Sequence, residues 1–194
     1  MFKALCCSAP LVLVFLLPTN ASLQGLVASS ASDEKELPEY RYPKIQGMGK
    51  VAHLPDADQQ PRSGSKVVVD LIKGGDAEKL NPGIEKVTRF VNIYAGAGKE
   101  PAEVSISVVL HGDATLICLK PDAYRAKYEC DNPNLDCIHK LKEAGVAIYV
   151  CGQSLVGKGF HPVEVIGDVD VAVSAMNTLV NLQADGHAFV LLGK

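Results

Sequence analysis

The sequence predicts an α/β protein with three layers, in which a mainly parallel five-stranded sheet has helices on both faces. Five short apolar runs have the length and the valine-rich composition of strands that are buried on both faces, as in parallel sheets. Segments with helical spacing lie between most of these runs. Such an alternation of strands and helices favours right-handed crossovers, and therefore a parallel sheet.

The strands are predicted at residues 66–72, 104–110, 146–150, 169–173 and 188–192. The first contains three consecutive valines, which is typical of a strand without a solvent-exposed face. The third leads into Cys151, and the polar and glycine-containing residues that follow predict that the thiol stands at the start of a loop or of a helix.

Helical spacing predicts helices over residues 82–96, 135–144 and 175–184. Pro82 suits a first helical turn, Asn134 and Ser174 are good N-caps, and Gly145 and Gly186 are typical of helix ends. Shorter helical pieces are predicted at residues 115–120 and 122–128, and a turn or a helix start at residues 161–165. Residues 152–160, which follow Cys151, hold three glycines.

The N-terminal residues have the pattern of an export signal and not of a part of the folded domain. An apolar run at residues 11–17 follows Lys3, and small residues reach to Ala31, so residues 1–31 are interpreted as a secretory signal peptide. The alternative is an uncleaved anchor. Cleavage would remove Cys6 and Cys7, would leave no membrane span, and would place the protein in the periplasm or outside the cell.

Residues 32–65 are polar and rich in proline, and they predict an extended arm that lies over the domain or over a neighbouring subunit. A disordered linker is the alternative for its first ten residues. The α/β domain is then expected at residues 66–194.

Composition argues against several classes of function. A net charge of −3 without a long Lys/Arg cluster argues against nucleic-acid binding, and the absence of tryptophan argues against stacking platforms. Neither a dinucleotide nor a P-loop glycine motif is present, and no cysteine or histidine spacing fits zinc. We therefore expect no cofactor and no metal.

Chemistry in open parallel sheets takes place at the carboxyl ends of the strands. Cys151, His111 and either Asp70 or Asp76 are expected there. Free backbone N–H groups and the positive end of a helix would favour a Cys151 thiolate, although a buried structural cysteine is the alternative. His111 is a candidate to pair with the thiolate or to donate a proton, or else an ordinary loop histidine. The predicted ligand pocket consists of Asp70, Gly74, Gly75, Gly152, Gln153 and Asn177.

Four cysteines remain after the leader, and in an exported protein an even number suggests disulfides. Cys130 and Cys137 lie on either side of a turn at residues 131–134, so a bridge between them is plausible. Four cysteines allow three pairings, and the others stay open. One of these cysteines could also resolve Cys151 as a disulfide, which would suit a redox sensor.

Five stretches, taken in order and spacing, resemble the DsrE/DsrF-like family. They are Asn81-Pro82-Gly83, residues 109–112, residues 141–146, residues 149–153 and residues 174–180, and the resemblance covers about Tyr42 to Leu192. It implies a small α/β domain that forms trimers or hexamers. Some members are cytoplasmic sulfur-relay proteins, in which a cysteine near the end of the third strand carries persulfide between partners. Cys151 occupies that place.

The leading hypothesis is therefore an exported sulfur carrier or sulfurtransferase-like protein that uses Cys151, with a sulfur donor or acceptor protein as partner. Export would separate it from a cytoplasmic sulfur donor. Two alternatives remain open: an oligomeric module that binds a small ligand without catalysis, and a thiol redox sensor.

Overall fold

The centre of the fold is a five-stranded sheet in the order β6-β5-β4-β3-β7, in which every neighbouring pair is parallel. The structure is a computed structural model, and it describes residues 37–192. The strands are β3 (Ser65–Leu71), β4 (Val104–Leu110), β5 (Ala147–Cys151), β6 (Asp170–Ala172) and β7 (Ala188–Leu192). The predicted α/β class with a five-stranded parallel sheet is confirmed.

Two strand boundaries differ from the prediction in ways that concern the site. Strand β5 continues to Cys151, which pairs with Ala172 of β6. Strand β6 covers three residues rather than the five predicted, because it lies at the edge of the sheet and pairs only with β5. The thiol of Cys151 thus belongs to the last residue of a strand.

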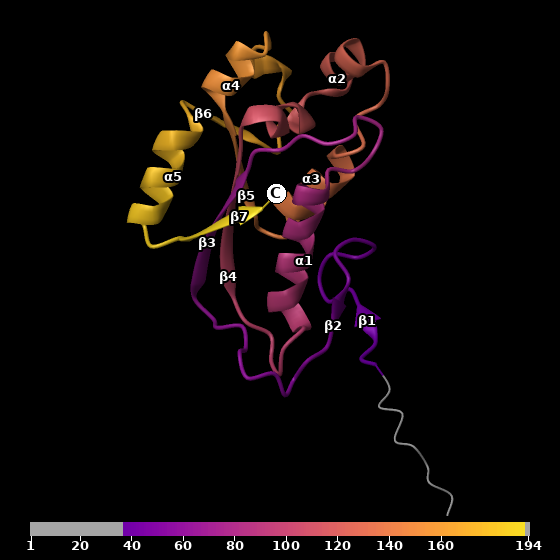
Figure 1. The fold of residues 1–194 in the computed structure, drawn as a ribbon, viewed down its shortest axis with the longest axis vertical. Coiled ribbons are helices and arrows are strands. Elements are labelled where there is room, and N and C mark those ends of the chain that lie inside the picture. Colours follow the sequence, from indigo (N-terminus) through magenta and orange to yellow (C-terminus); the bar gives the residue numbers. More distant parts are fainter. Residues whose placement is uncertain (1–36, 193–194) are drawn as a thin grey trace, which may run out of the picture. The chain divides into compact units, whose positions relative to one another are not determined.

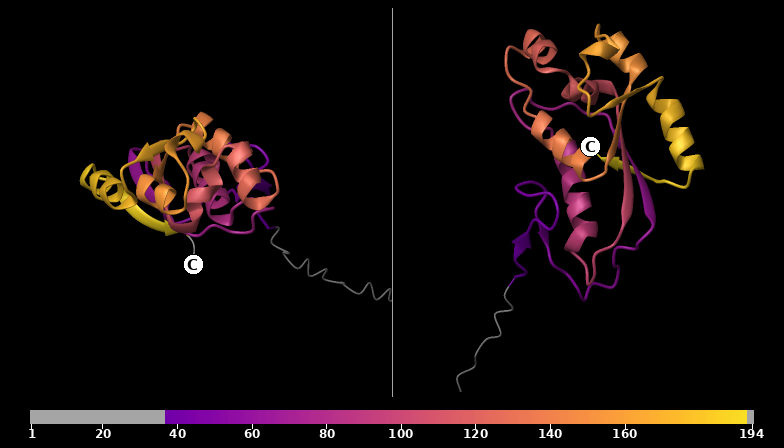
Figure 2. Two further views of the ribbon diagram at one scale, coloured as in Figure 1. Left: turned by 90° about the horizontal axis from the view of Figure 1, so that it is seen from above. Right: turned by 180° about the vertical axis from the view of Figure 1, so that it is seen from behind.

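Helices cover both faces of the sheet, as predicted. Helices α1 (Pro82–Gly96) and α3 (Leu135–Glu143) pack on one face, and α5 (Ala175–Ala184) packs on the other (Figures 1 and 2). The side chains of Asn81 and Ser174 accept backbone N–H groups at the starts of α1 and α5. These caps satisfy donors that have no partner inside a helix.

Short helices occupy the carboxyl end of the sheet (Figure 1). They are η1 (Gly112–Cys118), α2 (Pro121–Tyr128), α4 (Gly152–Gly157) and η2 (Pro162–Glu164). Of the two alternatives predicted after Cys151, a helix forms. The first of the two pieces predicted around Pro121 is a 3-10 helix that begins earlier, at Gly112.

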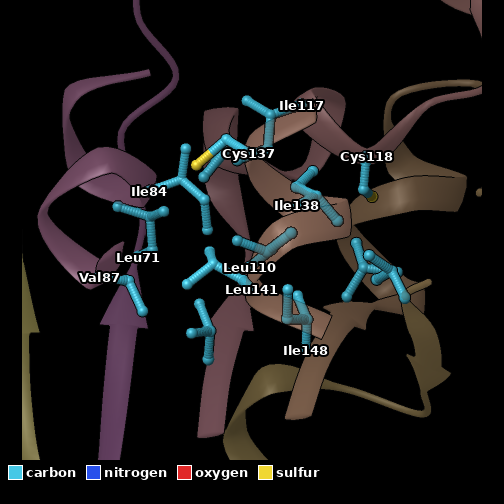
Figure 3. Close-up of a cluster of buried hydrophobic side chains, with 14 of the residues drawn as sticks. Leu71, Ile84, Val87, Leu110, Ile117, Cys118, Cys137, Ile138, Leu141 and Ile148 are labelled. Carbon is cyan, nitrogen blue, oxygen red and sulfur yellow. The ribbon is translucent and has the colours of Figure 1, made fainter. Parts of the chain in front are cut away.

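The sheet separates two hydrophobic cores. The larger one lies between the sheet and helices α1 and α3, and it includes the fully buried Leu71, Ile84, Ile138 and Leu141 (Figure 3). The smaller one, on the α5 side, consists of Val68, Val109, Cys151 and Ala175. Cys151 is therefore on the side of the sheet that is covered by a single helix.

Residues 37–64 pack along α1. Strands β1 (Tyr40–Arg41) and β2 (Val51–Ala52) form an antiparallel pair. The buried Asn92 of α1 accepts the N–H groups of Lys44 and Ile45 and donates to the carbonyls of Ile45, Met48 and Gly49. Gly49 is required there, because a Cβ atom would lie 2.2 Å from the backbone nitrogen of Arg89. The side chain of Asn92 thus fixes the course of this segment.

The predicted signal peptide at residues 1–31, with Cys6 and Cys7, lies outside the described residues, as do residues 32–36. Within residues 37–192, no helix is long and apolar enough to cross a membrane.

Candidate functional site: the cysteine at the carboxyl end of β5

Cys151 joins strand β5 to helix α4. It is the last residue of β5 and at the same time the N-cap of α4, with extended backbone angles. The next position requires a glycine because the chain passes close to β6 there. A Cβ atom on Gly152 would lie 2.7 Å from the carbonyl oxygen of Ala172. Any side chain there would push the start of α4 away from the sheet, and the thiol with it.

Hydrogen-bond donors surround the sulfur atom of Cys151. The backbone N–H of Ser154 donates to Sγ over 3.4 Å. The residue is only 5% exposed, and burial alone would raise the pKa of its thiol. Hydrogen bonds from the Ser154 hydroxyl and from the backbone N–H groups of Ser154, Ala175 and Gln153 outweigh that effect, so the pKa is lowered. The site therefore favours a thiolate.

Ser154 connects the thiol to the neighbouring strand. Its hydroxyl oxygen accepts the backbone N–H of Gly112 over 3.4 Å, so its own proton remains available for Cys151. Gly112 has a positive φ of 55° and passes close to the carbonyl oxygen of Ile72. Ser154 was not among the predicted site residues. Its signal was present in the spacing, because a residue three positions after an N-cap points its N–H back at the cap.

His111 and Asp70 form a pair on the same face of the sheet as Cys151. His111 Nε2 lies 2.7 Å from Asp70 Oδ1, and the Asp70 side chain is only 8% exposed. The backbone N–H of His111 donates to Leu71, so β4 keeps its extended course at this residue. Leu110 pairs with Val150, and the next residues along these neighbouring strands are His111 and Cys151. Neighbouring strands lie about 4.8 Å apart.

The imidazole thus faces a buried carboxylate and stands next to the thiol along the sheet. The expected direct pairing of His111 with Cys151 is not what the structure shows, since the hydrogen bond of His111 Nε2 goes to Asp70. Asp70, predicted as a residue of the ligand pocket, instead holds the histidine ring. Asp76, the other acidic candidate, is bound to Lys79 at an exposed position, and this contact lowers the pKa of its carboxyl group.

The other residues of the predicted pocket separate into two groups. Gly152 and Gln153 belong to the turn around the sulfur, and Gln153 contributes its backbone N–H. Gly74 and Gly75 lie in the loop after β3, against Asp113 and the capping residue Asn81. Asn177 belongs to neither group, because it forms a capping box with Ser174 at the start of α5. The structure thus gives Asn177 a part in folding.

The remaining described cysteines are free thiols in unlike surroundings. The expected bridge between Cys130 and Cys137 is absent: Cys137 faces into the larger core (Figure 3), whereas Cys130 Sγ faces the carbonyl of Ala77. Burial raises the pKa of Cys118 and of Cys137 to about 12, and burial also raises that of Cys130. Among residues 37–192, only Cys151 has a thiol whose pKa is lowered.

The site has the donors for an anion and not the ligands for a metal. In the described part of the chain, no group of three or more His, Cys, Asp and Glu side chains is placed to hold a metal ion. The donors around Cys151 are N–H and O–H groups, which stabilise negative charge on sulfur. The arrangement can therefore keep a nucleophilic sulfur ionised, with a histidine–carboxylate pair beside it.

Comparison with family models identifies the family. The model of the DsrE/DsrF-like family matches residues 66–191. No curated protein matches the chain. Among solved structures, a protein of unknown function, MTH1491 from Methanobacterium thermoautotrophicum, is similar, with 18% sequence identity and a TM-score of 0.46. That match covers 66% of this chain and 98% of the other. The family match extends over most of the chain, and it includes both the Cys151 turn and the Asp70–His111 pair: the chain belongs to the DsrE/DsrF-like family.

Proposed function

We propose that the protein carries sulfane sulfur as a persulfide on Cys151. The observation that supports this most is the contrast in pKa: among the four described cysteines, the thiol of Cys151 alone is surrounded by donors that favour the thiolate. The thiolate is the form that attacks sulfur. Membership of the DsrE/DsrF-like family is consistent with a role of this kind.

The transfer needs a donor that is itself a persulfide. The Cys151 thiolate attacks the outer sulfur of the donor, and the new S–S bond forms as the bond between the two donor sulfurs breaks. The outer sulfur moves with its proton, and the donor leaves as a thiolate. No electron is gained or lost overall, so the step requires neither an oxidant nor a reductant.

The Asp70–His111 pair suits the protons of this step. A protonated His111 ring next to Cys151 would give its proton to the departing donor thiolate. The new persulfide is more acidic than a thiol, so it would return a proton to the ring as it ionises. Asp70 does not reach the sulfur in this proposal: it is a positioning residue that holds the ring through Nε2.

The experiment is persulfide loading of the full chain. The protein is incubated with glutathione persulfide, separated from it, and analysed by intact mass and peptide mapping. We expect a mass increase of about 32 Da, one sulfur atom, on the Cys151 peptide. Cys151→Ser should abolish the adduct, and the matched Cys130→Ser should retain it. No adduct in the wild-type chain, or an adduct retained in Cys151→Ser, contradicts the proposal. The first result would favour a binding module.

We further propose that the protein works as a homo-oligomer that exchanges sulfur with a partner protein. Large apolar side chains exposed on α5, just before it and on the edge strands β6 and β7 support the oligomer. They are Val171, Val173, Met176, Val180, Phe189 and Leu191. Such a concentration of exposed apolar residues is typical of an association surface. Native mass spectrometry should give a trimer or hexamer, and a monomer at micromolar concentration would contradict it.

We propose a periplasmic or secreted location on the basis of the leader pattern at residues 1–31. The measurement is the N-terminal sequence of the protein recovered from the producing cell. A mature terminus near Ala31 supports export, whereas recovery of an intact Met1 from the cytoplasm contradicts it.

A further inference from the structure

A cavity separate from the Cys151 site lies beside the C-terminal half of α1. It is a groove of about 380 Å³ between the segment of residues 40–61 and the C-terminal half of α1. Most of its surface is apolar, and none of the residues of the Cys151 site lines it. We call it the arm groove. Its apolar wall includes Val51, Leu54 and Ile93, of which Val51 is buried and Ile93 half-buried.

Hydrogen bonds hold both walls of the arm groove in place. The Leu54 N–H donates to Ala97 at the end of α1 over 2.6 Å. Gln60 donates to the carbonyls of Leu54, Pro55 and Ala57, and accepts the Lys99 N–H over 2.8 Å. The guanidinium group of Arg41 also donates to the carbonyl of Gly96. The groove is therefore a formed feature of the fold, and a ligand would enter it without ordering a loop.

The charges around the arm groove have one sign. Lys50 and Arg89 line it, and neither Asp nor Glu is among the lining residues. Both cationic side chains are exposed, and within residues 37–192 neither forms an ion pair. The ammonium group of Lys50 lies 4.7 Å from the centre of the Tyr40 ring. The groove thus offers an apolar wall and two cations that have no carboxylate partner among residues 37–192.

Only one wall of the arm groove lies outside the part of the chain that matches the family, since Arg89 and Ile93 on the other wall lie within it. The family model covers residues 66–191, whereas one wall of the groove is built from residues 40–61. None of the lining residues belongs to the Cys151 site, so ligand binding in the groove can be tested independently of sulfur chemistry at Cys151.

We propose that the arm groove binds a small amphiphile with one anionic head group, such as a medium-chain carboxylate. The apolar body packs against Val51, Leu54 and Ile93, and the head group lies between Lys50 and Arg89. A neutral amphiphile of the same length loses the attraction of the two cations, and a cationic one is repelled.

The test is calorimetric titration of the full chain with decanoate, decanol and decyltrimethylammonium, each below its micelle concentration. We expect decanoate to bind to one site, decanol at least about tenfold more weakly, and the cation not at all. The double variant Lys50→Gln, Arg89→Gln should weaken decanoate binding about tenfold. Lys86→Gln is the matched control, since Lys86 is exposed on α1 but does not line the groove, and it should bind like the wild type.

Three results would overturn the proposal. The first is no decanoate binding, and the second is equal binding of decanol. The third is binding only in the variant Asp33→Asn, Glu34→Gln, Glu36→Gln, which would assign the groove to the chain's own acidic segment. Ile93→Ser provides a second variant that reduces the apolar wall and should weaken decanoate and decanol alike. Persulfide loading at Cys151 should be unchanged in all of these variants, so the two proposals succeed or fail separately.

Discussion

Cys151 and Cys118 are both almost completely buried, with 5% and 0% of the residue exposed, yet their thiols have opposite tendencies. Burial raises the pKa of Cys118, and its thiol donates to the carbonyl of Thr115 over 3.2 Å. Around Cys151 the partners are N–H and O–H donors, which favour the thiolate. Burial raises the pKa at both sites, and only at Cys151 do hydrogen-bond donors outweigh its effect.

The largest consequence of this contrast is selective alkylation. At about pH 7.5 we expect iodoacetamide to modify Cys151 at least about a thousandfold faster than Cys118, because the pKa of Cys118 is about 12 and that of Cys151 is lowered. Peptide mapping over time measures both rates. In denaturant the difference should disappear. A folded protein in which Cys130 reacts first would contradict the comparison.

The dependence of folding stability on pH above about 8 tests the raised pKa of Cys118. The folded chain keeps this thiol protonated up to about pH 12, whereas in the unfolded chain it ionises near pH 8.5. A raised pKa in the folded state means that stability is full below about pH 8.5 and is lost as the pH rises toward 12. Between about pH 8.5 and 10.5, the unfolding free energy of the wild type should fall because Cys118 resists ionisation. In Cys118→Ala the fall should be smaller by roughly 2 kcal/mol.

Urea denaturation at a series of pH values measures this slope. Cys130→Ala is the comparison variant: Cys130 is only partly buried, so its removal should change the slope less than removal of the fully buried Cys118. Identical slopes for Cys118→Ala and the wild type would show that the buried thiol ionises without cost.

Ser154→Ala tests why the pKa of Cys151 is lowered. Loss of the hydroxyl removes one donor to the thiolate, so the pKa of Cys151 should rise by about one unit and alkylation near neutral pH should slow about tenfold. Ser154→Thr keeps the hydroxyl and should behave like the wild type. Gln153→Ala should also have no effect, because only the backbone N–H of Gln153 contacts the sulfur. The pH profile of alkylation gives the pKa directly; an unchanged profile in Ser154→Ala would remove the hydroxyl from the site.

Asp70→Asn should have the smallest effect. It preserves the shape of the side chain but removes the charge that holds His111, so persulfide loading should slow about threefold. The alkylation rate of Cys151 should stay within about twofold, since Asp70 is not among the groups that shift its pKa. Asp76→Asn is the control, as Asp76 is exposed and bound to Lys79. Equal persulfide loading of the wild type, Asp70→Asn and Asp76→Asn would show that the Asp70–His111 pair takes no part in the transfer.

Much of this fold was predictable because apolar runs and helix caps are local signals. The three valines from Val67 to Val69 predicted a strand buried on both faces, and Pro82 and Gly96 marked the ends of α1 as the structure has them. The place of Cys151 at the end of a strand also followed from its own neighbourhood. The family resemblance agrees with the match over residues 66–191.

The polar contacts of the site were harder to predict from the sequence, because they depend on the register between strands that are far apart in the chain. His111 and Asp70 are 41 residues apart, and only the pairing of β3 with β4 brings them together. The bridge between Cys130 and Cys137 failed for a similar reason. Closeness in sequence does not say where a side chain points, and the inward face of α3 takes Cys137 into the core.

The place of β7 in the sheet has a consequence for synthesis of the chain. Strand β3 is the first of the five to leave the ribosome, and β7, the last, pairs along it over Val67 to Leu71. One edge of β3 therefore stays open until β7 has been made. An open strand edge made of consecutive valines is prone to aggregation, so the pairing of β7 closes a vulnerable edge as well as completing the sheet.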